Sequence, residues 1–123
     1  MPGWDEIAAD NFQSANCLGK AGHWRSCVNR AYYAAFSAVT HVLTGKASFR
    51  QNRETPEHKQ VPMLIDCYLV DLPNMSMVKA AMRRLYNERI DADYKSGRTV
   101  DEATARIARQ DAYTVCKCLK VLR

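Results

Sequence analysis

The segment from Ala31 to Val39, with the sequence AYYAAFSAV, restricts the fold of this chain more than any other part of it. Apolar or small side chains occupy nearly every position, so a helix formed here has no polar face. A helix that is hydrophobic all round is normally surrounded by other helices. We therefore expect this segment to form the centre of a helix that lies inside a helical bundle.

The spacing of apolar side chains predicts five helical segments along the chain. The expected ranges are about 4–18, 23–43, 57–70, 75–94 and 100–122. No segment shows the convincing alternation that is typical of a strand. A chain of 123 residues is long enough to bury one core and corresponds to one domain. We predict an all-α, antiparallel bundle of four to five helices that spans residues 1–123.

Turn-forming and capping residues predict where several helices begin and end. Thr55 is the expected cap of the third helix and Pro56 suits its first turn. Pro62 is expected to kink that helix or to delay its start. Gly97 is the expected C-cap of the fourth helix, and Thr99 is expected to begin a capping box at the start of the fifth.

Composition excludes several classes of protein. No apolar run approaches the roughly 18 residues of a membrane span, and the first residues do not resemble a signal peptide, so we expect a cytoplasmic protein without membrane contact. The odd number of cysteines argues against a disulfide framework, and we expect them to be small buried side chains. The three histidines are scattered, so neither a metal nor a cofactor is expected. The net charge of +5 is compatible with nucleic acid or an acidic partner.

The sequence RRLYNERIDADYKSGR, residues 83–98, concentrates opposite charges at the end of the fourth helix. Arg89 follows Leu85 on the apolar stripe at i+4 spacing, so we expect it to be partly buried and to need an acceptor. Asp93 is the expected partner and Asp91 the alternative. Three interpretations remain: a structural ion pair, a site where Arg89 binds phosphate with help from Asp93 or Tyr94, or a solvated face.

The second helix carries a further arginine and an aromatic set. One interpretation is that Arg30 ends the buried section with its charge in solvent. The alternative is that Arg30 pairs with Asp91 or Asp93 across the bundle. Aromatic side chains at helical spacing usually pack, so a core or dimer-interface role is expected for the set, with base stacking as the alternative. The set consists of Tyr32, Tyr33 and Phe36.

Two motifs together resemble a known family. NRAYYAAFSAV is followed later by ERIDADYKSG and then by an alanine-rich amphipathic last helix, and this combination resembles HEPN-domain proteins over nearly the whole chain. The resemblance implies a bundle of four or five helices that is often dimeric. Small members resemble the partners of minimal nucleotidyltransferases in two-component toxin–antitoxin modules. Active members are metal-independent ribonucleases.

One departure from the family pattern concerns the catalytic histidine. In catalytic members an arginine is followed by four to six residues and then by a histidine. Counted from Arg89, that histidine would stand where this chain has Tyr94, Lys95 or Ser96. Tyrosine, with a reference pKa of about 10, is a poor general base near neutral pH. Asp93 would serve as a weak base only if it were desolvated.

A second arginine–histidine pair has the matching spacing, in the segment RETPEH. Pro56 lies between Arg53 and His58, and the segment belongs to a predicted loop. On a continuous helix, residues i and i+5 also diverge by about 140°. We therefore expect His58 to have a packing or hydrogen-bonding role at a helix start.

Two functions are compatible with these observations. The first is a component of a two-component module that acts on or binds RNA, with a degenerate ribonuclease motif and a minimal nucleotidyltransferase as partner. The second is a non-catalytic dimerisation or protein-interaction bundle. The resemblance also implies a homodimer in which the Arg89–Tyr94 segments of two chains approach each other. The candidate catalytic residues are Arg89, Asp93 and Tyr94, and the candidate RNA-binding residues are Arg83, Arg84 and Arg30.

Overall fold

A computed structural model of the chain describes residues 3–46 and 56–122, and these residues contain helices and turns but no strand. This confirms the prediction of an all-α fold. The helices in chain order are α1 (Trp4–Lys20), α2 (Trp24–Thr44), the short 3-10 helix η1 (His58–Gln60), α3 (Val61–Tyr68), α4 (Met75–Tyr94) and α5 (Glu102–Cys118).

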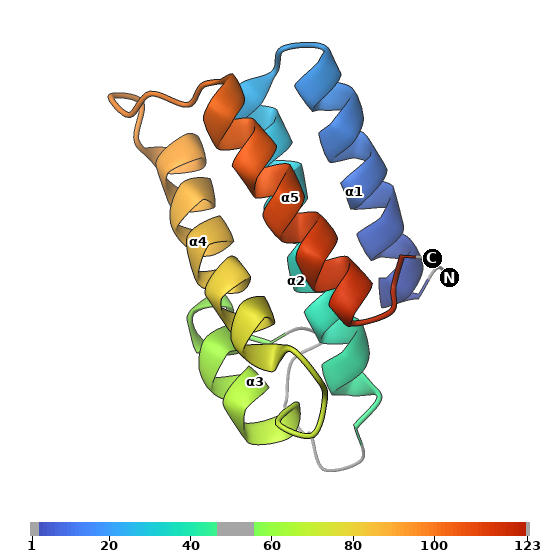
Figure 1. Cartoon of the computed structure of the whole chain (residues 1–123). Helices are drawn as coiled ribbons and strands as arrows, with labels where there is room; N and C mark the ends of the chain where they lie inside the picture. The colour runs from blue at the N-terminus through green and yellow to red at the C-terminus, as the bar shows by residue number, and fades with distance from the viewer. Residues whose placement is uncertain (1–2, 47–55, 123) are drawn as a thin grey trace.

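The four long helices lie side by side, and the short α3 packs against α4 at one end of the bundle (Figure 1). Helix α2 contacts α1, α4 and α5, so it occupies the central position. Its segment AYYAAFSAV is accordingly buried: Ala35 is fully enclosed and Phe36 is 4% exposed. The prediction that this helix is surrounded by others is confirmed.

Alanine is a frequent buried side chain along the contacts of the central helix. Small side chains let helix axes approach more closely than leucine or phenylalanine would, within the usual 8–10 Å range. The long helices therefore form a narrow core without large aromatic layers at these positions. Among the described helices, none is long and apolar enough to cross a membrane. The buried alanines of α1, α2 and α5 are Ala8, Ala15, Ala31, Ala34, Ala35, Ala38, Ala105, Ala108 and Ala112.

Helix α1 ends in a turn that needs a glycine. Gly22 has φ +81°, a left-handed conformation that a side chain disfavours. The amide of His23 donates to the carbonyl of Leu18 at 2.9 Å, and the amide of Gly22 donates to that of Gly19 at 3.2 Å. This pair of bonds is a Schellman motif, which reverses the chain tightly into α2.

Helix α5 ends earlier than predicted. Like α1 it ends in a Schellman motif, but the residue in the left-handed conformation is not a glycine. Lys120 has φ 61°, and the amide of Val121 donates to the carbonyl of Cys116 at 2.9 Å. The helix therefore stops at Cys118 rather than at Leu122. A lysine in the left-handed region carries no sequence signal for a helix end, so the pattern of apolar residues alone overestimates the length.

The end of α4 also differs from the prediction, because Gly97 is not its cap. Helix α4 ends at Tyr94 with Lys95 as the C-cap. The guanidinium of Arg25, at the start of α2, donates to the carbonyls of Asp91 at 3.2 Å and Ala92 at 2.8 Å. It also reaches the carbonyls of Lys95, Ser96 and Arg98. A side chain from another helix thus satisfies the carbonyl groups that a glycine turn would otherwise satisfy.

The third helix begins late, as Pro62 suggested. Pro62 lies in the first turn of α3, where a missing amide costs no hydrogen bond. The preceding residues form η1 instead of a continuous helix from residue 57. The predicted cap, Thr55, lies outside the described residues.

The N-cap of α5 is Asp101, and not Thr99 as the sequence had suggested, and this difference can be tested. The Asp101 carboxylate accepts from the amide of Thr104 at 2.9 Å, and this bond lowers the pKa of Asp101. We expect Asp101→Ala to lower the thermal unfolding midpoint at neutral pH, whereas Thr99→Ala leaves it nearly unchanged. A lowered folded-state pKa stabilises the fold above the ordinary pKa, so the Asp101→Ala effect should disappear as the pH falls through the folded pKa. Equal effects of the two substitutions would contradict this assignment.

Candidate functional site

Arg89 is a buried charge enclosed by tyrosine rings. The residue is 7% exposed although it carries a full positive charge. Its guanidinium carbon lies 4.9 Å from the ring centre of Tyr32, 5.8 Å from those of Tyr33 and Tyr86, and 6.0 Å from that of Tyr94. Cations are attracted to the faces of aromatic rings within about 6 Å. Four rings from α2 and α4 therefore surround one guanidinium.

The carboxylate partner of Arg89 is Asp93, as predicted, but the pair is long. The closest nitrogen–oxygen distance is 3.8 Å, and the Asp93 side chain is 23% exposed. Asn29 of α2 donates to the same carboxylate oxygen at 2.9 Å. The shorter bond orients Asp93 towards α2, so Asn29 rather than Arg89 fixes the position of this carboxylate.

Comparison of these contacts indicates what balances the charge of Arg89. The hydrogen bond from Arg89 to the Tyr33 hydroxyl is 3.5 Å long, and the buried Nε has no hydrogen-bond partner among the described residues. An i,i+4 pair in the order arginine–acid is a weak one. Desolvated cation–π contacts contribute up to about 2 kcal/mol or more each. The tyrosine rings, and not Asp93 alone, therefore offset the free-energy cost of burying the charge of Arg89.

Tyr94 closes the outer side of this enclosure. Its ring is 71% exposed and yet lies within cation–π distance of Arg89. It stands on the last turn of α4, whose terminal carbonyls are held by Arg25. Tyr94 is therefore the member of the candidate catalytic set that faces solvent, while Arg89 is the buried member.

The structure does not bring the three candidate RNA-binding arginines together. Arg84 is bound to Asp111 of α5 by two hydrogen bonds of 3.0 and 2.8 Å, and this bonding raises the pKa of Arg84. Arg30 is exposed and lies 3.4 Å from the amide oxygen of Asn11 on α1, so it does not pair with Asp91 or Asp93. Arg83 is exposed beside α3.

His58 lies close to the tyrosines although it is distant from Arg89 in the sequence. Its Nδ1 is 2.5 Å from the hydroxyl of Tyr32, and its ring stacks on Phe36 with 4.2 Å between centres. Burial raises the pKa of Tyr32, so its hydroxyl stays protonated. The expected packing and hydrogen-bonding role of His58 is confirmed, whereas Arg53 lies outside the described residues.

Metal and thiol chemistry find no support among the residues that the structure describes. No group of three or more histidine, cysteine or acidic side chains there is arranged to hold a metal ion. Cys27 and Cys116 are buried, and burial raises the pKa of the Cys116 thiol to about 12. Cys17 and Cys67 are exposed and Cys118 is only partly buried, so the expectation that the cysteines are buried is confirmed only for Cys27 and Cys116.

Sequence reasoning missed Arg25 and Asn29, which hold the end of α4 from the first turns of α2. Asn29 lies three residues before Tyr32 and so shares its side of the helix, but no such signal marks Arg25. The partner carbonyls lie more than sixty residues away, and nothing in the local pattern identifies them.

A comparison with protein families gives one match over nearly the whole chain. The model described as "HEPN domain" matches residues 1–122. A search of curated proteins finds no match to this chain.

The enclosure of Arg89 yields a stability prediction with a matched control on the same helix. Arg89→Ala leaves a void between four rings and removes the cation beside Asp93, so we expect it to lower the free energy of unfolding by about 3 kcal/mol or more. Arg83→Ala removes an exposed arginine and should change that free energy by no more than about 0.5 kcal/mol. Urea unfolding followed by circular dichroism measures both. A loss for Arg89→Ala that is as small as the one expected for Arg83→Ala would show that Arg89 is not a structural residue.

Proposed function

We infer that this chain, which belongs to the HEPN domain family, binds RNA as one component of a two-component module whose other component is a minimal nucleotidyltransferase. The observation that carries the inference is the state of Arg89. The arginine of the family motif is present, but it is buried under tyrosines, and no histidine follows it at the expected positions. These features argue against efficient cleavage and leave binding as the activity on RNA that we propose.

The chemistry of RNA cleavage supports this distinction. Attack by a ribose 2′-hydroxyl on the adjacent phosphate needs proton transfer and stabilisation of additional negative charge. The charge of Arg89 is directed to the rings of Tyr32, Tyr33 and Tyr86 inside the fold. A phosphate would reach Arg89 only if Tyr94 moved away. The candidate set of Arg89, Asp93 and Tyr94 therefore lacks both an accessible cation and a strong base.

Exposed cations near α3 and α4 support the RNA-binding part of the proposal. Arg83 and Lys59 are exposed and border the same cavity. Lys95 and Arg98, beyond the end of α4, share the carboxylate of Asp91, which reduces their availability. Phosphate contacts by such side chains supply most of the sequence-independent affinity for nucleic acid. Arg83 is the arginine that we expect to matter most.

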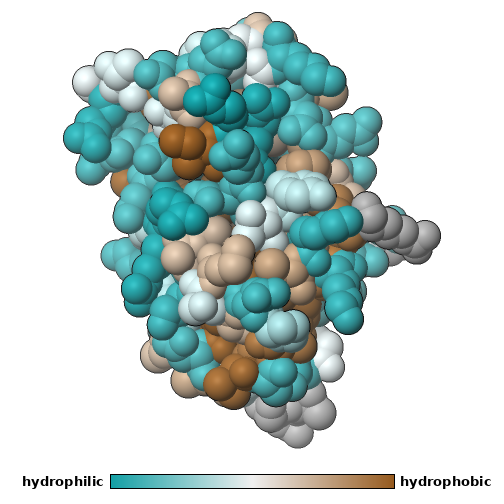
Figure 2. Space-filling view, viewed as in Figure 1, coloured by the Kyte–Doolittle hydropathy of each residue, from teal (hydrophilic) through white to brown (hydrophobic). Residues whose placement is uncertain are grey.

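The second candidate function, a protein-interaction bundle, is favoured by one specific surface. Hydrophobic side chains gather at the end of the molecule where α3 lies (Figure 2). Met63 on α3, Val70 after it and Met77 on α4 are each at least half exposed. Apolar groups that remain exposed together are typical of surfaces that contact a partner. The nucleotidyltransferase partner would cover them.

RNA binding is tested with a fluorescently labelled single-stranded RNA and anisotropy measured over a range of salt concentrations. We expect Arg83→Ala to weaken binding several-fold and to reduce the salt slope by about 0.7, because one phosphate contact is lost. Arg106→Ala removes an exposed arginine from a separate hollow between α1 and α5 and should leave binding unchanged.

The same samples, resolved on gels, test cleavage. We expect no turnover of the RNA by the wild-type protein in the presence of a metal chelator. Rapid cleavage that disappears in Arg89→Ala, with the fold of that variant intact, would overturn the view of Arg89 as a structural residue.

The dimer is tested by sedimentation at tens of micromolar protein. We expect a homodimer in which the Arg89–Tyr94 segments approach across a two-fold axis, since the most exposed ring of the enclosure lies there. Tyr94→Glu would place a charge in that contact and should produce monomers. Tyr113→Glu changes a half-exposed tyrosine on α5 and serves as the control. A wild-type protein that sediments only as a monomer would refute the dimer.

A further inference from the structure

We propose that the cavity between α2, η1, α3 and α4 binds a single base of single-stranded RNA and thereby determines which nucleotide the protein prefers. This inference rests on the proposed RNA-binding function and adds a place and a ligand group to it. The cavity has a volume of about 260 Å³. Sites for drug-sized molecules usually measure about 300–1,000 Å³, so this one suits a smaller group such as one base.

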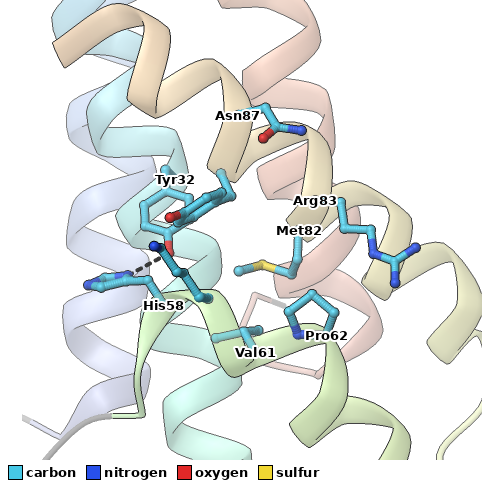
Figure 3. A pocket seen from close by; sticks show the side chains of 9 residues that line it. Tyr32, His58, Val61, Pro62, Met82, Arg83 and Asn87 are labelled. Carbon is cyan, nitrogen blue, oxygen red and sulfur yellow. Dashed lines mark hydrogen bonds between the residues drawn. The ribbon is translucent and has the colours of Figure 1, made fainter. Parts of the chain in front are cut away.

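One side of the cavity is apolar and comes from two helices. Val61 and Pro62 at the start of α3 face Met82 of α4 (Figure 3). Val61 and Met82 are almost fully buried, so their positions are fixed by the core. Pro62 is part-exposed and is the member of this side that the face of an aromatic ring can cover, because both surfaces then lose contact with water.

The other side is aromatic and held in place by contacts inside the protein. Tyr32 and Tyr86 line the cavity together with His58. Tyr32 is 1% exposed and bound to His58, which in turn stacks on Phe36. Tyr32 therefore forms the buried back of this wall. Tyr86 is part-exposed and packs edge-on against Tyr32, so it is the ring on which a base can stack with little loss of side-chain entropy.

Arg89 supports this wall from inside the protein. Its guanidinium lies within cation–π distance of Tyr32 and Tyr86, the same two rings that line the cavity. Arg89 is thus a positioning residue: it orients the rings and does not touch the RNA. This gives the buried arginine a part in RNA binding that requires no contact with phosphate.

Polar side chains at the rim match the remaining parts of a nucleotide. The exposed amide of Asn87 offers both a donor and an acceptor, which is what the edge of a base requires. The exposed cations of Arg83 and Lys59 stand where the sugar–phosphate chain would leave the cavity. An aliphatic side chain of a protein partner would fill the apolar part but leave the amide and both cations unmatched. This favours a base over a protein side chain.

The test compares RNA oligomers of equal length that carry adenine, guanine, cytosine, uracil or no base, using anisotropy at constant salt. The wild-type protein should bind its preferred oligomer about tenfold or more tightly than the abasic one, in line with the usual contribution of base stacking. Tyr86→Ala should remove most of this difference, whereas Tyr86→Phe should preserve it. Asn87→Ala should make the four bases more alike, and Gln110→Ala, an exposed amide on α5, should have no effect.

The possible failures are distinguishable. If the wild-type protein binds no RNA at all, both the proposed RNA-binding function and the proposed base pocket are wrong. If it binds the abasic oligomer as tightly as the others, the proposed base pocket is wrong but the proposed RNA binding is retained. The same conclusion follows if neither Tyr86→Ala nor Asn87→Ala changes the preference among the bases. Asn87 is exposed, so its variant decides the question even if Tyr86→Ala unfolds the protein.

Discussion

The enclosure of one guanidinium by tyrosine rings determines how α2 and α4 meet. Burial of an unpaired charge would be expensive, yet the nearest carboxylate stands 3.8 Å from Arg89. The ring faces of Tyr32 and Tyr33 from α2 compensate for lost water, and they do so only when the two helices are in register. Other features follow from this contact: the position of Tyr94, the bond between Tyr32 and His58, and one wall of the cavity beside α3.

The fold was largely predictable because it depends on periodic burial. The all-apolar stretch around Phe36 required a central helix, and every long helix was located within a few residues. The errors concern helix ends, where contacts distant in sequence or unusual backbone angles decide. Lys120 terminates α5 with a positive φ that its residue type does not suggest. Arg25 caps α4 from another helix, so Gly97 was not needed.

The site was predictable only in part. The position of Arg89 on an apolar stripe indicated a buried charge near Asp93, and both are found. Of the tyrosines around it, Tyr32 and Tyr33 were expected to be core or dimer-interface residues, but no pattern in the chain indicates that four rings converge on one cation. The three candidate arginines carry the same charge, and Arg83 and Arg84 are adjacent in the sequence. Arg84 nevertheless binds Asp111, and Arg30 lies against α1. Arg83 differs from these two arginines in the direction in which its side chain leaves the helix, and residue type does not reveal that direction.

The capture of α4 carbonyls by Arg25 also bears on how the molecule moves. A helix end normally frays alone, because its last carbonyls can exchange protein partners for water one at a time. Here the carbonyls of Asp91 and Ala92, with those of the following turn, share one guanidinium on α2. They therefore lose this shared donor together when the Arg25 side chain moves away. Fraying at the end of α4 is thus coupled to the first turns of α2 through one side chain, although the two segments lie more than sixty residues apart in the sequence.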